Sequence, residues 1–358
     1  WVPEMTGTYA WLARDPERAR DIVAAVNLDM VGQDQERCGS TFLIEHPPHY
    51  ASSFAEELLL RIRREAVDWV PSYSGPGHYS MTRLGEVPFS GGSDHAILID
   101  PATGIPCPMM IQWPDRYYHS SHDTPDKTDP ASLALAVRCA ATYAGFIASA
   151  GEGERRWLLG VVGRGARRRL LAAVDDASSE LTILRERARG EHALTSLARL
   201  GLDPAAIVTA IGQLAAFAGQ EAPGVPPDPP ATMSATPRGV TLASPKAGCW
   251  RRALPVPVHS QRHLLGGWSA LDAVTREQWR AREEEQSDGT LLCDLAWYAC
   301  DGRRTVEEIA RLVWIETGRY EPGFIAGFFE LMGSLGLSSP SGAQETAFSS
   351  GAPDTATR

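Results

Sequence analysis

Residues 112–127 read QWPDRYYHSSHDTPDK, and this stretch indicates how the first part of the chain folds. It follows a short apolar run, Pro106 to Trp113, that predicts a buried strand. It precedes Asp129-Pro130, where an aspartate cap and a proline in the first turn predict the start of a helix. His119 therefore lies in a loop between the carboxyl end of a strand and a helix. Open α/β sheets bind ligands at that place.

A second strand end carries an aspartate. Asp29 lies in Asn27-Leu28-Asp29-Met30-Val31-Gly32, at the end of an apolar run from Ile22 to Met30 that predicts another strand. Side chains presented from two strand ends can meet at one edge of a sheet. Asp29 and His119 are therefore candidates for a common site.

Residues 1–150 alternate strand-like and helix-like segments, which is typical of an α/β layer architecture. The other predicted segments are a helix with its loop over 7–20, a strand over 41–44, a helix capped by Ser52, a strand over 86–89 within a glycine-rich loop from 74 to 92, and a helix over 130–149.

Size and composition narrow the classes of function. At 358 residues the chain is long enough for about two domains. Its net charge of −10 argues against a nucleic-acid partner, which requires a basic face. No apolar run is seen that is long enough to predict a membrane span. The six cysteines are scattered, which favours reduced thiols in a cytoplasmic protein.

Composition also divides the chain. We expect an α/β domain over 1–150, a helical extension over 151–220, a proline-rich linker over 221–238, an α-rich domain over 239–337 and a disordered tail over 338–358. The α-rich domain over 239–337 contains three amphipathic helices, the second of which begins with a capping box of Thr305 and Glu308. The arginine-rich stretch 162–169 fits either a phosphate-binding turn or a solvated helical face, and the helical face is favoured.

Four places in the first part gather groups suited to metal binding or acid–base chemistry: Glu4, Asp29, the pair Asp94-His95, and His119. Zinc accepts imidazole and carboxylate ligands, and a catalytic site leaves one position open for water. Each ligand needs a partner that fixes its orientation, a role that Asp94 or Asp123 could fill.

Three motifs in order resemble the carboxyl half of the di-zinc aminopeptidase family, the clan MH metallopeptidases. They are Asn27-Leu28-Asp29-Met30-Val31-Gly32, then Gly92-Ser93-Asp94-His95, then Tyr118-His119-Ser120 with Asp123-Thr124-Pro125-Asp126 before a long helix. Pro3-Glu4-Met5-Thr6-Gly7-Thr8 resembles the segment where the family has two adjacent glutamates. The resemblance covers residues 1 to about 150 and is nearest to a bacterial aminopeptidase-like branch.

The resemblance implies a three-layer αβα fold with a mixed sheet, phosphorylase/hydrolase-like. It implies that Asp29 and His119 are zinc ligands, one on each of two ions, and that Glu4 is either a further ligand or the general base. Asp94 would support the site, and Tyr118 and Trp113 would line the pocket or belong to the core. The expected activity is hydrolysis of amino-terminal peptide bonds in a peptide or small aminoacyl substrate by metal-activated water.

Two departures from the family pattern shape a rival hypothesis. In the family, a His-x-Asp motif and an aspartate that bridges the two metals precede the paired glutamates, and this sequence begins at Trp1 without them. In addition, Pro3 stands where the first of the paired glutamates is expected. The fold is therefore expected to be incomplete at its amino terminus. The alternative is a non-catalytic binding protein on the same scaffold. Residues 290–337 resemble a winged-helix module. Such a module could serve protein interaction or homo-oligomer formation, or it could be an accessory domain that packs on the first domain.

Overall fold

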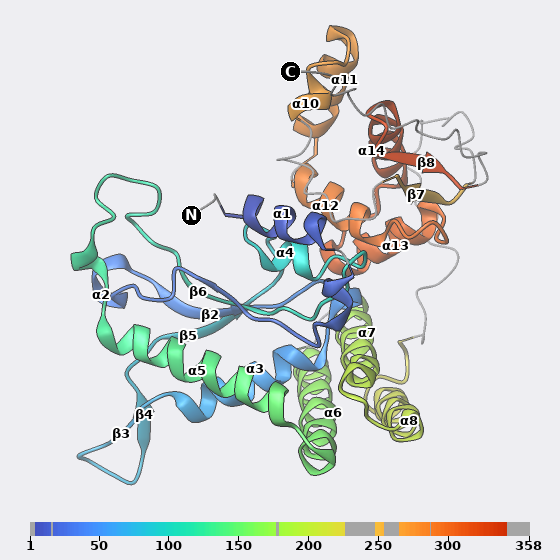
Figure 1. Cartoon of the computed structure of the whole chain (residues 1–358). Coiled ribbons are helices and arrows are strands. Elements are labelled where there is room, and N and C mark those ends of the chain that lie inside the picture. The colour runs from blue at the N-terminus through green and yellow to red at the C-terminus, as the bar shows by residue number, and fades with distance from the viewer. Residues whose placement is uncertain are drawn as a thin grey trace, which may run out of the picture.

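The computed structural model describes residues 4–15, 17–176, 179–225, 248–253, 265–286 and 288–341. Its first part is a mixed β-sheet with helices on both faces, and its later parts are helix-rich (Figure 1). The expected α/β layer architecture is confirmed at this level. The winged-helix form of the carboxyl-terminal module stays a prediction.

The sheet has four strands in the order β1-β6-β2-β5. Strand β1 (Asn27–Asp29) pairs in parallel with β6 (Met109–Trp113), and β2 (Thr41–Glu45) pairs in parallel with β5 (Leu84–Val87). Strands β2 and β6 are antiparallel and join the two pairs. The sheet is mixed for this reason.

Two longer helices, α3 (Phe54–Ala66) and α5 (Pro130–Ser149), cover one face of the sheet, and α1 (Thr6–Arg14) and α4 (His95–Leu98) lie over the other (Figure 1). Buried side chains of β2, β6, α3 and α5 form one apolar core. A smaller core joins α1 to α4. Short helical turns connect these elements: η1 (Arg18–Asp21), α2 (Gln35–Cys38), η2 (His49–Ala51) and η3 (Pro125–Lys127).

The caps of the two longer helices explain where they begin. Asp129 accepts hydrogen bonds from the backbone of Ala131 and Ser132, as predicted, and Pro130 opens α5. At α3 the predicted cap, Ser52, is wrong by one residue. Ser53 caps the helix, because its side chain and that of Glu56 form a capping box.

The predicted strands 22–30 and 106–113 are both shorter in the structure. Backbone hydrogen bonds do join the two segments upstream, from Ala25 to Pro106 and from Asn27 to Pro108. Pro106 and Pro108 have no N–H group to complete the ladder. The regular strands therefore begin only at Asn27 and Met109.

The predicted loop 74–92 is partly wrong as well. A small hairpin pairs β3 (Trp69–Pro71) with β4 (His78–Ser80), and β5 covers 84–87 rather than 86–89. The hairpin has little packing to reveal it in a sequence pattern, since the residues of β3 are exposed. Glycine and proline between its strands permit the turn.

The segment predicted as a helical extension contains α6 (Glu152–Asp175), α7 (Glu180–Ser196), η4 (Leu197–Leu200) and α8 (Pro204–Glu221). The arginine-rich stretch 162–169 lies inside α6. It is therefore a helical face, as favoured, and not a phosphate-binding turn.

The carboxyl-terminal part contains α10 (Leu265–Trp268), α11 (Ala273–Glu284), α12 (Gly289–Ala299), α13 (Val306–Thr317) and α14 (Pro322–Ser334). The predicted capping box of Thr305 and Glu308 is present at α13. The tail prediction is wrong at its start, because β8 (Ser338–Pro340) pairs with β7 (Trp250–Arg252). Residues 226–238 of the predicted linker, 239–247 and 254–264 of the predicted α-rich domain, and 342–358 of the predicted tail lie outside the described residues.

The carboxyl-terminal helices share a core with the first part of the chain. Phe89, Ala96 and Ile99 pack in one cluster with side chains of α12, α13 and α14. The Tyr50 hydroxyl donates to the Leu295 carbonyl oxygen at 2.8 Å. The His49 ring is paired with the Glu316 carboxylate at 2.7 Å. The cysteines are free thiols, and all but Cys249 are buried.

One helix within the described ranges, α5, is long and apolar enough to cross a membrane by length and composition alone, so the expectation that no segment reaches this limit is wrong. A helix that packs inside a soluble protein passes the same test. Here α5 packs against α3 and contributes Leu135, Cys139 and Tyr143 to the core.

Candidate functional site

The parallel pairing of β1 and β6 brings two predicted site segments to one edge of the sheet. Asp29 stands beside Ile111, and the loop that carries His119 leaves β6 after Trp113. The returning end of that loop is hydrogen-bonded to the chain just after β1, through Asp34 N to the Lys127 oxygen at 2.7 Å and Asp129 N to the Gly32 oxygen at 2.8 Å. The two segments are thus joined at the carboxyl ends of these strands.

The same geometry places Asp29 and Glu4 on one side of the sheet. Asn27 and Asp29 are two residues apart in β1, so their side chains point to the same face. The Asn27 amide donates to the Ser93 hydroxyl at 2.7 Å, just before α4, which identifies that face as the one under α1 and α4. Glu4 precedes Met5, which is buried against Ile97 of α4.

Backbone strain concentrates at these positions. Four residues other than glycine have positive φ angles in the described part of the chain: Met5, Met30, His119 and Asp288. Met5 follows Glu4, Met30 follows Asp29, and His119 is itself a predicted ligand. A left-handed backbone at a residue with a side chain costs roughly 1–3 kcal/mol and is concentrated at functional sites. The strain therefore marks three of the four places that the sequence selected, all but the pair Asp94-His95.

The exposure of the predicted residues differs. Glu4, His119 and Asp123 are exposed, and Asp29 is half-buried. The His119 ring stacks on Tyr118 with centroids 3.6 Å apart, and Tyr118 lies edge-on to Trp113 at 5.0 Å. Trp113 and Tyr118 are 41% and 44% exposed, so neither belongs to the core. Their role as pocket walls stays a prediction.

The described residues do not assemble a metal cage. Within the part of the chain that the structure describes, no three His, Cys, Asp or Glu side chains form a group able to hold a metal ion. Glu4, Asp29 and His119 are thus not brought together as such a group. A catalytic zinc ion takes three protein ligands. These side chains alone therefore do not fit a zinc site.

Asp94 has an unusual environment. Its Oδ1 atom is buried and has no hydrogen-bond partner among the described residues. The side chain does not cap α4, although Asp94 stands at the capping position. A buried carboxylate oxygen without a partner is costly, and its presence asks for an explanation. The supporting role of Asp94 stays a prediction.

Sequence reasoning missed one buried polar network. Glu45, at the end of β2, is 3% exposed, and His95 is 1% exposed. The Glu45 carboxylate pairs with His95 Nε2 at 2.8 Å and accepts hydrogen bonds from the Ser90 backbone and hydroxyl, each at 2.7 Å. Glu45 directly follows the predicted strand 41–44, and Asp29 likewise lies at a predicted strand end; this position was the signal that could have found Glu45.

The electrostatics of this network favour a charged carboxylate. Burial acts to raise the pKa of Glu45, but the hydrogen bonds from His95 and Ser90 outweigh burial and hold the pKa below its ordinary value. Asn27 lies 3.4 Å from His95 Nδ1, on the other side of the ring. A proton on His95 Nε2, donated to Glu45, satisfies both contacts.

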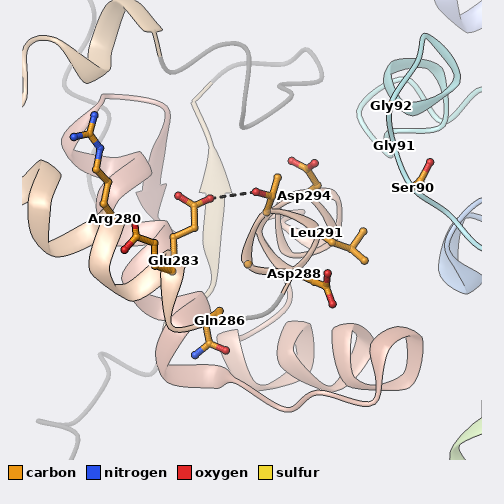
Figure 2. Close-up of a pocket in the computed structure, with 12 residues that line it drawn as sticks. Ser90, Gly91, Gly92, Arg280, Glu283, Gln286, Asp288, Leu291 and Asp294 are labelled. Carbon is orange, nitrogen blue, oxygen red and sulfur yellow. Dashed lines mark hydrogen bonds between the residues drawn. The ribbon is translucent and has the colours of Figure 1, made fainter. Parts of the chain in front are cut away.

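The structure also contains a cavity of about 560 Å³ between the first part of the chain and the carboxyl-terminal helices. Figure 2 shows Ser90, Gly91 and Gly92 on one side of it. The other side carries the acidic residues Glu283, Glu284, Asp288 and Asp294 with Arg280. None of the site residues predicted from the sequence is among those that line this cavity.

Comparison with known families identifies the first part of the chain. Residues 5–144 match the family model of peptidase family M28. The match supports an aminopeptidase-like partial domain of the M28 metallopeptidases, which belong to clan MH, over these residues, and it confirms the resemblance inferred from the motifs. M28 peptidases are zinc-dependent in general.

Searches of curated proteins and of solved structures found no match to this chain.

Proposed function

We propose that this protein is a metallo-aminopeptidase that hydrolyses amino-terminal peptide bonds, with Asp29 and His119 as ligands of a zinc centre and Glu4 as a further ligand or as the general base. The M28 match over residues 5–144 supports a zinc metallopeptidase in general. The observation that carries the assignment to these residues is the left-handed backbone at Met5, Met30 and His119.

The proposal has a consequence for where the remaining ligands come from. Because the described residues hold no group of three ligands, at least one more zinc ligand must come from outside them. A site with two zinc ions, as the resemblance implies, would need further ligands. Asp94 and Asp123 are proposed as orienting groups for the ligands.

A second candidate is a binding protein on the same scaffold without catalysis, in which the carboxyl-terminal helices form the interaction module. The specific observation in its favour is the same lack of a three-ligand group among the described residues. The protein's location in the cytoplasm, and self-association through the carboxyl-terminal module, are further proposals that rest on the sequence alone.

Zinc content and hydrolysis together decide between the two candidates. The purified full chain is assayed for bound zinc by elemental analysis and for cleavage of an aminoacyl anilide with and without a chelator. Stoichiometric zinc with turnover that the chelator abolishes supports the aminopeptidase. A chain without zinc and without turnover overturns it in favour of the binding protein.

A pair of variants in one loop tests His119 itself. His119→Ala should weaken zinc binding by at least about tenfold, since loss even of a residue that only orients a ligand can cost that much. His122→Ala is the matched control, because His122 is exposed in the same loop and has no proposed role. Equal zinc content in both variants would remove His119 from the site.

A further inference from the structure

A basic groove lies between α6 and α8 of the helical extension, apart from the residues of the proposed metallopeptidase site. Its volume is about 440 Å³. This is within the range of small-molecule binding sites, roughly 300–1,000 Å³. The residues that line it from α6 include Arg156, Arg164 and Arg167, and α8 contributes Thr209 and Gln213.

The spacing of these residues along α6 explains the groove. Arg156, Gly160, Arg164 and Arg167 are separated by four, four and three positions, so they share one face of the helix. Gly160 and Gly163 lack side chains and leave room between the helices. A Cβ atom added at Gly163 would meet nothing within 4 Å, so this part of the groove is open.

Two of the arginines have no carboxylate partner. Arg164 makes no hydrogen bond or ion pair with the residues that the structure describes. Arg167 contacts only neutral groups, the Gln213 amide oxygen at 3.5 Å and the Phe217 ring at 5.7 Å.

The third arginine and the rest of the chain provide a contrast. Arg156 is ion-paired with Glu152 at 2.6 Å. The chain carries a net charge of −10, and other arginines nearby are paired, such as Arg169 with Glu57 and Glu186. Arg164 and Arg167 thus place two guanidinium groups without a carboxylate partner on one face of a groove, and together they create a local positive potential.

We propose that this groove binds a small molecule through a phosphate group held by Arg164 and Arg167. Guanidinium groups match phosphate oxygens with paired N–H donors, and arginine is preferred over lysine for this geometry. The hydroxyl of Thr209 and the amide of Gln213 add neutral polar groups from α8. The groove is larger than a phosphate group requires, so it accommodates further parts of the ligand.

Titration of the full chain with pyrophosphate, followed by calorimetry, tests the proposal. The wild-type chain should bind with a dissociation constant of about 1 mM or lower. The double variant Arg164→Gln/Arg167→Gln should bind at least about tenfold more weakly, because hydrogen bonds between charged groups are lost. The variant should fold normally, since neither arginine holds a buried contact; the thermal unfolding curve verifies this.

A charge-matched control separates the groove from a general effect of net charge. Arg61→Gln/Arg168→Gln removes the same two charges from exposed positions that do not line the groove. Its affinity for pyrophosphate should stay within about twofold of wild type. No binding by the wild-type chain, or equal affinity of the groove variant and the control, would overturn the proposal.

A steric variant tests the groove without changing charge. Gly163→Leu places a side chain in the open space and should weaken pyrophosphate binding. Gly153→Leu is its matched control, because Gly153 is also an α6 glycine with no atom near an added Cβ but does not line the groove. Unchanged binding in Gly163→Leu with weakened binding in Gly153→Leu would contradict the assignment of the ligand to this groove.

Discussion

The two ends of the β1–β6 pair differ in how their polar residues are held. Near the amino ends, Glu45 and His95 are buried and joined to each other and to Ser90. At the carboxyl ends, Asp29 is half-buried and His119 is exposed, and the backbone at Met30 and His119 is left-handed. Both ends belong to the region that matches the M28 family.

This difference separates a structural role from a functional one. A buried polar network that is fully bonded rigidifies a fold and becomes costly when one member is removed. Exposed polar residues on strained backbone contribute little to stability, and their conformation costs free energy instead. The first end should therefore respond to mutation through stability, and the second through binding and activity.

The largest effect on stability is expected from His95→Ala. The change leaves the buried Glu45 carboxylate without its histidine partner, which should lower the free energy of unfolding by about 3 kcal/mol. Urea denaturation measures the free energy of unfolding. The control is His78→Ala, at an exposed histidine of β4, whose free energy of unfolding should stay within about 0.5 kcal/mol of wild type. Equal stability of the two variants would show that the buried network is not structural.

A smaller effect is expected in acid. The pKa of Glu45 is lowered in the folded state, so its contribution to stability is present above its ordinary value of 4.5 and is lost as the pH falls through the folded pKa. The pKa of Glu316, which is paired with His49, is also lowered in the folded state, because the histidine contacts outweigh the effect of burial. The pKa of Glu56 is raised by burial, so its effect on the pH dependence of stability is opposite to that of Glu45 and Glu316.

The variant Glu45→Gln isolates one of these contributions. Its free energy of unfolding should depend less steeply on pH below 4.5 than that of wild type, as measured by urea denaturation at a series of pH values. Glu65→Gln, at an exposed residue of α3, is the control. A wild-type slope in Glu45→Gln would mean that the pKa of Glu45 is not lowered in the folded protein.

The smallest effect, and one of opposite sign, is expected from His119→Gly. His119 has a left-handed backbone, which costs a residue with a side chain roughly 1–2 kcal/mol and costs glycine nothing. Glycine loses more backbone entropy on folding, which offsets part of this gain, so the free energy of unfolding should rise by about 0.5–1 kcal/mol. His119→Ala keeps a Cβ atom and should show no such gain. Thermal unfolding compares the two, and a destabilised glycine variant would place His119 with the structural end of the sheet.

Much of the fold could be predicted from the sequence, for local reasons. The helix α5, with its Asp129 cap, and the capping box at Thr305 follow from short-range rules that hold in any context. The limits of β1 and β6 could not, because they depend on which residues of the 22–30 segment lie opposite Pro106 and Pro108. The hairpin β3–β4 was missed because its exposed residues show no apolar alternation.

The residues of the candidate site also fall into those that the sequence could predict and those that it could not. Asp29 and His119 were selected by residue type and position at strand ends, and both segments do emerge at one edge of the sheet. Glu45 was not selected, although it also closes a strand, because its partner His95 lies far away in the sequence. The pairing exists only once β2 and α4 are packed together.

The sequence by itself determined the M28 motifs, the alternation of strand-like and helix-like segments in the first part and the capped helices, since each depends on neighbouring residues. Only the tertiary structure decided which face of the sheet carries Asn27, Asp29 and α4, that the carboxyl-terminal helices share a core with Phe89 and Ile99, and that α6 and α8 leave a groove between them. These features arise from contacts between segments distant in the chain. Burial and strand register, which no local pattern specifies, select among the possible contacts.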